Sequence, residues 1–180
     1  MRLLVSLILS LQISCGYQAL QTAKLFGHST IYLETFAEAS PLGLSPELAS
    51  AMHRQFLQGG LVISHDSFAQ HPILSGKIRR ITNKPSSLAG SGSRIPAYQI
   101  RLNIDVLLKE PSGEILWEKT FFFSEDYLSP RASVENSVLK TEANKRRALN
   151  RMAEKIANEI HAQIFLQTNI VSSSEIKSQP

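Results

Sequence analysis

A long alternation of apolar and polar side chains, from residue 98 to 109 (YQIRLNIDVLLK), constrains the fold most strongly. One face of such a strand carries Tyr98, Ile100, Leu102, Ile104, Val106 and Leu108; the other carries Gln99, Arg101, Asn103, Asp105 and Lys109, with Leu107 as the exception. A period of two predicts a β-strand buried on one face only. The chain must therefore supply a second layer to cover the apolar face.

The segments that follow this strand extend it into a hairpin. Residues 110–113 (EPSG) suit a type I turn with proline at its second position. Residues 114–124 (EILWEKTFFFS) then return as the partner strand. We expect the single tryptophan, Trp117, to lie in the core or on a face of the sheet.

The remaining elements are predicted from shorter signals. Ser45-Pro46-Glu47 is typical of a helix start, with serine as the cap, and Gly59-Gly60 of a helix end. The other predictions are strands at 29–38, 61–63 and 73–82 and a long helix at about 133–166, with Val138, Leu149, Met152, Ile156 and Ile160 on its apolar face. From Ser172 we expect a polar, frayed tail.

The order of these elements predicts the fold class. A chain of 180 residues that is 43% hydrophobic and 19% charged suits one domain with a sizeable core. The order β-α-β-β-β-β-α indicates an α+β fold, with two helices packed on one face of a mixed or antiparallel sheet of four or five strands.

The N-terminus resembles an export signal that ends at the single cysteine, Cys15. A basic start is followed by an uncharged apolar run, residues 3–13, which is too short to span a bilayer. Cleavage before Cys15 would give the arrangement of bacterial lipoproteins, in which the cysteine sulfur carries lipid. Gln12 stands where an aliphatic residue is usual, and an ordinary signal peptide with a chance cysteine is the alternative. We predict a lipoprotein signal peptide (1–14), an α+β domain (15–170) and a polar tail (171–180).

No common catalytic motif is present in the sequence. The segment 90–93 (GSGS) does not place a serine as a nucleophile elbow requires, and neither a dinucleotide-binding nor a P-loop pattern occurs. His65, Asp66 and His71 lie in a predicted loop without the spacing of metal ligands, so solvated side chains explain them better. We therefore expect a protein that is not an enzyme and that holds no metal or cofactor.

Charge is distributed unevenly along the chain. The formal net charge is +4, yet no acidic residue occurs between Asp66 and Asp105. The basic residues of this segment are Lys77, Arg79, Arg80, Lys84, Arg94 and Arg101. Arginine suits the bidentate recognition of phosphate. A solvated strand face beside a mobile loop explains the run equally well, and nucleic acid is a poorer fit because only Tyr98 lies nearby.

Taken in order, these features resemble those of the outer-membrane lipopolysaccharide-assembly lipoproteins, the LptE family. They are Cys15-Gly16-Tyr17, a first strand with a capped helix (31–56), the hairpin AYQIRLNIDVLLKEPSGEILWEKTFFFSEDY (97–127), and a final helix containing LNRMAEKIANEI (149–160). The resemblance covers about residues 15–166.

The resemblance implies a fold, a location and partners. Family members place two helices against a four-stranded sheet and plug a large outer-membrane β-barrel, LptD, which they help to assemble. They perform no chemistry, face the periplasm from a lipid anchor, and offer basic side chains to lipopolysaccharide. The residue ahead of the tyrosine-led strand corresponds to Arg94, and the one before the last helix to Arg131. Lys77, Arg79 and Arg80 complete the predicted lipopolysaccharide-binding set.

Two other functional classes stay open at this point. A peripheral lipoprotein carrier would shield an acyl chain in a cavity and would need no barrel. A lipoprotein hydrolase could assemble its site from scattered residues, although no motif supports it.

Overall fold

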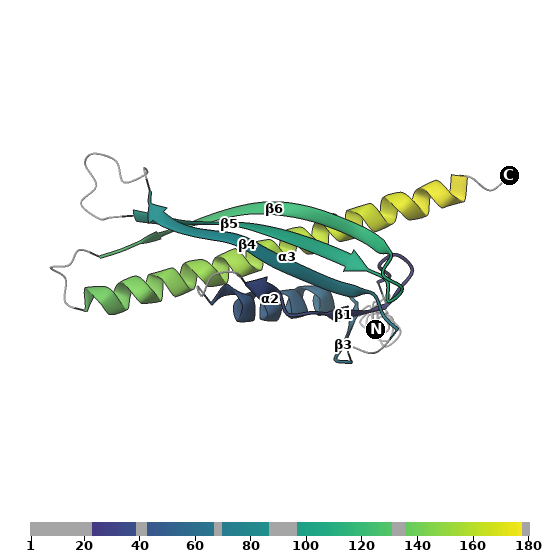
Figure 1. Cartoon of the computed structure of the whole chain (residues 1–180), viewed down its shortest axis with the longest axis horizontal. Helices are drawn as coiled ribbons and strands as arrows, with labels where there is room; N and C mark the ends of the chain where they lie inside the picture. Colours follow the sequence, from purple (N-terminus) through teal and green to yellow (C-terminus); the bar gives the residue numbers. More distant parts are fainter. Residues whose placement is uncertain (1–22, 39–42, 67–69, 87–96, 131–135, 178–180) are drawn as a thin grey trace, which may run out of the picture.

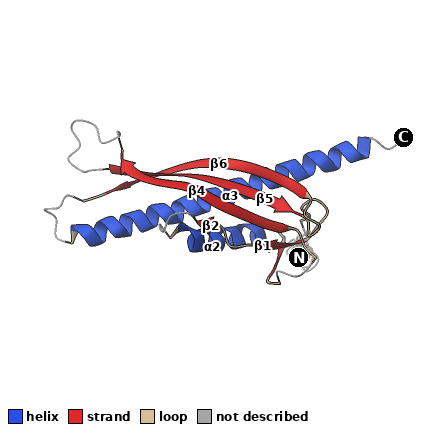
Figure 2. Cartoon of the chain, viewed as in Figure 1, coloured by secondary structure: helices blue, strands red, loops and turns tan. Residues whose placement is uncertain are grey.

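The computed structural model describes residues 23–38, 43–66, 70–86, 97–130 and 136–177. Its elements are β1 (Thr30–Leu33), β2 (Ala37–Glu38), α2 (Leu44–Gln58), β3 (Val62–Ser64), β4 (Ile73–Pro85), β5 (Ala97–Lys109), β6 (Ile115–Leu128) and α3 (Ser137–Lys177). The strands form one six-stranded sheet in the order β3-β1-β4-β5-β6, with β2 paired to β4. Helices α2 and α3 lie on the same face of this sheet (Figures 1 and 2). The α+β prediction is confirmed, although the sheet has more strands than we expected.

The long strands β4, β5 and β6 form an antiparallel meander, and the short strands pair in parallel beside it. The predicted alternation in β5 is confirmed, because Ile104 and Val106 are both buried while Asp105 lies on the opposite face. Strand β6 continues to Leu128, four residues beyond the end that we predicted. We call the face of the sheet that lies opposite the helices the outer face.

The strand predicted at 29–38 is divided into β1 and β2 by residues 34–36, the last of which is Phe36. The ring of Phe36 is 1% exposed and lies over Gly76 of β4, where an added Cβ atom would come within 2.1 Å of it. Any larger residue at 76 would displace the ring, so this glycine allows a loop side chain to join the core. The sequence pattern could not show the break because Phe36 is as apolar as a strand residue.

Helix α2 begins at Leu44, two residues before the predicted start at Pro46, and its N-cap residue makes no side-chain hydrogen bond. Its N-cap is Gly43, which has a φ of 75°. Ser45 instead donates its hydroxyl hydrogen to the carbonyl oxygen of Phe36 (2.8 Å), and its backbone N–H donates to Glu38 Oε2 (3.1 Å). The prediction of Ser45 as the cap was therefore wrong. The glycine stop is confirmed, since the helix ends at Gln58.

Helix α3 is longer than predicted and runs along the whole sheet. Its 41 residues correspond to about 60 Å, and its C-terminal end projects beyond the strands in Figure 1. Leu149, Met152, Ile156 and Ile160 are buried as expected, but Val138 is 74% exposed, so its assignment to the apolar face was wrong. The helix also continues to Lys177, through the start of the expected tail.

The buried residues form one continuous cluster between the sheet and the helices. Met152 is fully buried in it and Trp117 is 9% exposed, as predicted. Met52 of α2 is fully buried there too. Three predicted functional residues, Cys15, Arg94 and Arg131, lie outside the described residues, as does the predicted signal segment 1–14.

Candidate functional site

Basic side chains gather on the outer face of β4 and β5. The helices cover the opposite face, so the polar residues that alternate along these strands are directed to solvent. Lys77, Arg79, Arg80, Lys84 and Arg101 are all exposed there, and we call them the outer basic patch.

A β-bulge in β4 brings two adjacent arginines to this face. The register passes from Ile78 opposite Ile104 directly to Arg80 opposite Asn103. In an uninterrupted strand Arg80 would share the buried face of Ile78, two residues before it. The extra residue, Arg79, reverses the alternation, so that Arg80 is exposed and Ile81 packs against the core.

Asp105 holds one of these arginines. Arg79 Nε donates a hydrogen bond to Asp105 Oδ2, and Thr120 Oγ1 donates to Oδ1 at 2.8 Å. Desolvation opposes ionisation of this carboxyl, but the hydrogen bonds from Arg79 and Thr120, with the charges of Arg79 and Lys77, lower its pKa below the ordinary value of 3.8. Asp105 therefore stays ionised and balances charge at the Lys77 and Arg79 end of the patch.

The other end of the patch forms a pocket of about 400 Å³, which we call the outer pocket. It is lined by Arg80, Thr82, Lys84, Pro85, Ser86, Gln99, Arg101 and Asn103. None of these lining residues is acidic. Arg101 Nε donates to Gln99 Oε1, a neutral partner, so no carboxylate of the pocket lining balances the charge of the guanidinium. A site with three cations and polar neighbours suits an anion with several oxygens, such as phosphate.

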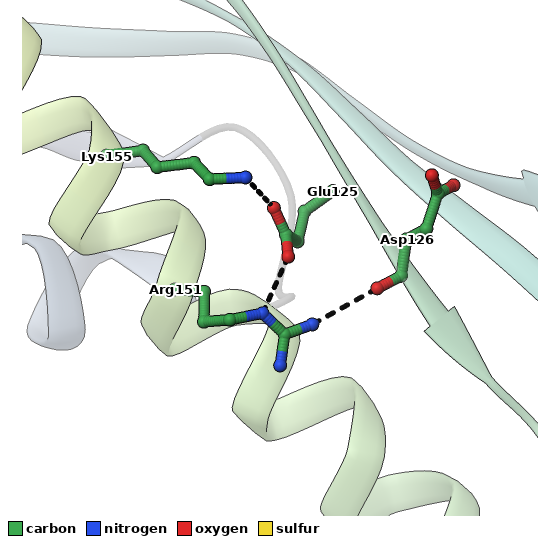
Figure 3. Close-up of polar contacts among 4 residues, drawn as sticks. All are labelled: Glu125, Asp126, Arg151 and Lys155. Carbon is green, nitrogen blue, oxygen red and sulfur yellow. Dashed lines mark hydrogen bonds and ion pairs between the residues drawn. The ribbon is translucent and has the colours of Figure 1, made fainter.

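The cations on the helix side of the molecule are arranged differently. Arg151 Nε donates to Glu125 Oε1 at 2.6 Å, Lys155 donates to Oε2, and Arg151 also reaches the carbonyl oxygen of Asp126 at 3.2 Å (Figure 3). Arg54 is paired with Glu154 on the neighbouring helix. Carboxylates thus accompany these cations, whereas the outer pocket has none in its lining.

The structure brings together only part of the predicted binding set. Arg80 lines the outer pocket, while Lys77 and Arg79 lie beside Asp105. The predicted ligand Arg94 belongs to a segment whose flanking residues, Ser86 and Ala97, are joined by a backbone hydrogen bond of 2.8 Å at the pocket end of β4 and β5.

Sequence reasoning left two pocket residues, Lys84 and Arg101, out of the predicted set. Both belong to the basic run that the sequence shows, and Arg101 falls on the polar face of the predicted strand. The missing information was the register between β4 and β5, which brings the two side chains together.

The described residues also bear on two other kinds of site. Among them no group of three His, Cys, Asp or Glu side chains is placed to hold a metal ion, and His65 instead stacks against His53 at 6.1 Å. A helix with the length and hydropathy to cross a membrane is likewise not found within the described part of the chain.

Three solved structures with the same fold are distant from this chain in sequence. A minor lipoprotein from Acinetobacter baumannii is 15% identical with a TM-score of 0.50, over 76% of this chain and 92% of that one. A protein from Caulobacter crescentus CB15, described as a lipoprotein, is 12% identical with a TM-score of 0.50, over 75% and 91%. A neuraminyllactose-binding hemagglutinin homolog from Helicobacter pylori is 14% identical with a TM-score of 0.53, over 85% and 93%. At these identities the likeness concerns the fold alone.

The sequence comparisons decide the family. No curated protein matches the chain. The profile of the family described as "LptE: Lipopolysaccharide-assembly" matches residues 29–164, from β1 to the middle of α3. That match covers both layers of the fold and the whole outer basic patch, and the chain therefore belongs to the LptE lipopolysaccharide-assembly family.

Proposed function

We propose that this protein is an outer-membrane lipoprotein that takes part in lipopolysaccharide assembly as the plug of a large LptD-like β-barrel. Membership of the LptE family supports an assembly role. The lipid on Cys15 would hold the domain at the periplasmic side of the outer membrane. The domain acts by binding and by shape, without catalysis, as is usual in this family.

We further propose that the protein binds lipopolysaccharide through its basic side chains. The proposed ligands are Arg94, Arg131, Lys77, Arg79 and Arg80. The observation that carries this proposal is the outer basic patch, an exposed positive surface on a chain of this family, with a pocket at one end whose lining contains no acid. Phosphate groups on the saccharide of lipopolysaccharide offer the matching negative charge.

The test of the plug is copurification from detergent-solubilised outer membrane. A plug needs a large, shape-matched interface, so the tagged full-length protein should recover one large β-barrel protein in near-equal amounts. The matched control is an outer-membrane lipoprotein that carries the same tag and is expressed at the same level. If the tagged chain recovers no barrel protein above that control, the alternative of a peripheral acyl-chain carrier replaces the plug.

A further inference from the structure

We propose that the outer pocket binds a phosphate group of a phosphorylated lipid headgroup, with Arg80, Lys84 and Arg101 as its ligands. This inference rests on the proposed binding of lipopolysaccharide, and it assigns one phosphate group of that ligand to the outer pocket. It adds Lys84 and Arg101 to the residues expected from the sequence, and it gives Arg79 a lesser role.

The charge balance selects this end of the patch. Asp105 accepts a hydrogen bond from Arg79 and lies near Lys77, so an arriving anion would compete there with a fixed carboxylate. The lining of the outer pocket contains no carboxylate. An anion is therefore attracted more strongly to Arg80, Lys84 and Arg101 than to Arg79, one residue away.

The strand register places the three cations around one point. Thr82 stands between Arg80 and Lys84 on the outer face of β4, and Arg101 of β5 lies directly opposite Thr82. Arg101 is thus the diagonal neighbour of both other cations, at a typical Cα separation of about 7–8 Å. Side chains as long as arginine and lysine can converge across that distance on one phosphate, with the Thr82 hydroxyl between them.

An exposed aromatic ring beside the outer pocket indicates that the ligand has an apolar part as well. Phe122 of β6 is 73% exposed on the outer face and lies directly opposite Asn103, which lines the pocket. A free phosphate ion would make no use of this ring. A phosphorylated amphiphile could place its phosphate in the pocket and its sugar or acyl portion over Phe122.

The experiment measures binding of the full-length protein to lipopolysaccharide and to the same lipopolysaccharide after enzymatic removal of its phosphates. We expect Arg80→Gln, Lys84→Gln and Arg101→Gln each to weaken binding of the phosphorylated form by about five- to tenfold. Removal of the phosphates should weaken binding by the wild type and have little further effect on the triple variant. Inorganic phosphate should compete only at much higher concentration, because it cannot contact Phe122.

Two further variants, which each remove one positive charge as the pocket variants do, serve for comparison. Lys140→Gln lies on α3, away from the outer face, and should bind as the wild type does. Arg79→Gln should lose less affinity than Arg80→Gln, although the two residues are adjacent. Equal losses for these two, or equal binding of both lipid forms by the wild type, would overturn the pocket assignment while lipopolysaccharide binding itself stands. If the wild type bound neither form, the binding part of the proposed function would fail as well.

Discussion

At the scale of single residues, Glu125 is the least expected feature of the molecule. It occupies an inward-facing position of β6, between two aromatic positions, and is 9% exposed. Burial opposes its ionisation, but hydrogen bonds and charges from Lys155 and Arg151 together lower its pKa below the ordinary value of 4.5. If both cations were removed, the buried carboxylate would carry an unpaired charge and would destabilise the folded state.

The first prediction concerns this cluster. Replacing both Arg151 and Lys155 by alanine should lower the free energy of unfolding at pH 7 by about 3 kcal/mol, as measured by urea denaturation. Because the pKa of Glu125 is lower in the folded state, its stabilising effect is present above pH 4.5 and is lost as the pH falls below that value. The double variant should therefore lose less stability than the wild type on acidification below pH 4.5. If the unfolding free energies of the two proteins fell by the same amount below pH 4.5, the cluster would not be the cause of the pH dependence of stability.

At the scale of elements, β6 is the edge of the sheet and α3 lies along it. The carbonyl oxygens of Asp126 and Leu128 accept hydrogen bonds from Arg151 and from Asn144 (2.8 Å) on α3. Alternate residues of an antiparallel strand direct both backbone groups to the same side. Ser124 thus directs its N–H away from β5, like Asp126, whereas Lys119 donates to the β5 ladder.

The second prediction uses proline to test this assignment of the edge. Both side chains are exposed, but Lys119 also donates a hydrogen bond to Gln163 Oε1 on α3 (2.8 Å). Each proline variant is therefore compared with alanine at the same position, so that Lys119→Pro and Ser124→Pro differ in the direction of the lost N–H. Lys119→Pro should cost about 1–3 kcal/mol of unfolding free energy, because a ladder hydrogen bond is lost. Ser124→Pro should cost distinctly less, as proline is tolerated where the N–H faces outward from an edge strand. The same loss for both in thermal or urea unfolding would refute the register.

At the scale of the whole molecule, charge is segregated between the two layers. Several cations of the helix layer are paired with acids, as in Arg146 with Glu47 and Arg54 with Glu154. On the outer face of the sheet, the lining of the outer pocket contains three cations and no acid. One side of the molecule therefore suits an anionic ligand, and exposed charges of this kind act over about 10 Å at 0.1 M salt.

The third prediction concerns the attachment of this whole domain to a membrane. Metabolic labelling with palmitate should mark the wild type and leave Cys15→Ala unlabelled, and the variant should leave the outer-membrane fraction. The physical reason is that buried acyl chains contribute about 0.8 kcal/mol per CH₂ group to membrane binding. Cys15→Ser, which keeps a polar side chain of similar size, is the matched control and should behave as the alanine variant does. Label retained by both variants would refute the lipoprotein signal.

Most of the fold was determined by local sequence patterns. The alternation in β5, the turn at 110–113 and the glycines after α2 predicted a hairpin and a helix that the structure confirms. These predictions succeeded because period and turn chemistry depend on neighbouring residues alone. The basic run in the sequence likewise pointed to β4 and β5 as the place to look for an anion site.

Only the tertiary structure decided which of those cations act together. The bulge at Arg79 turns Arg80 outward, and the β4–β5 register sets Arg101 opposite Thr82. Asp105 balances Arg79 only because it lies across the strand pair, 26 residues away in sequence. In the sequence, Glu125 interrupts the apolar face of its strand. The structure explains this inward carboxylate by the cations that α3 places beside it. In each case the partner lies on another element, so only the packing of distant segments decides which charges are balanced and which are free to bind a ligand.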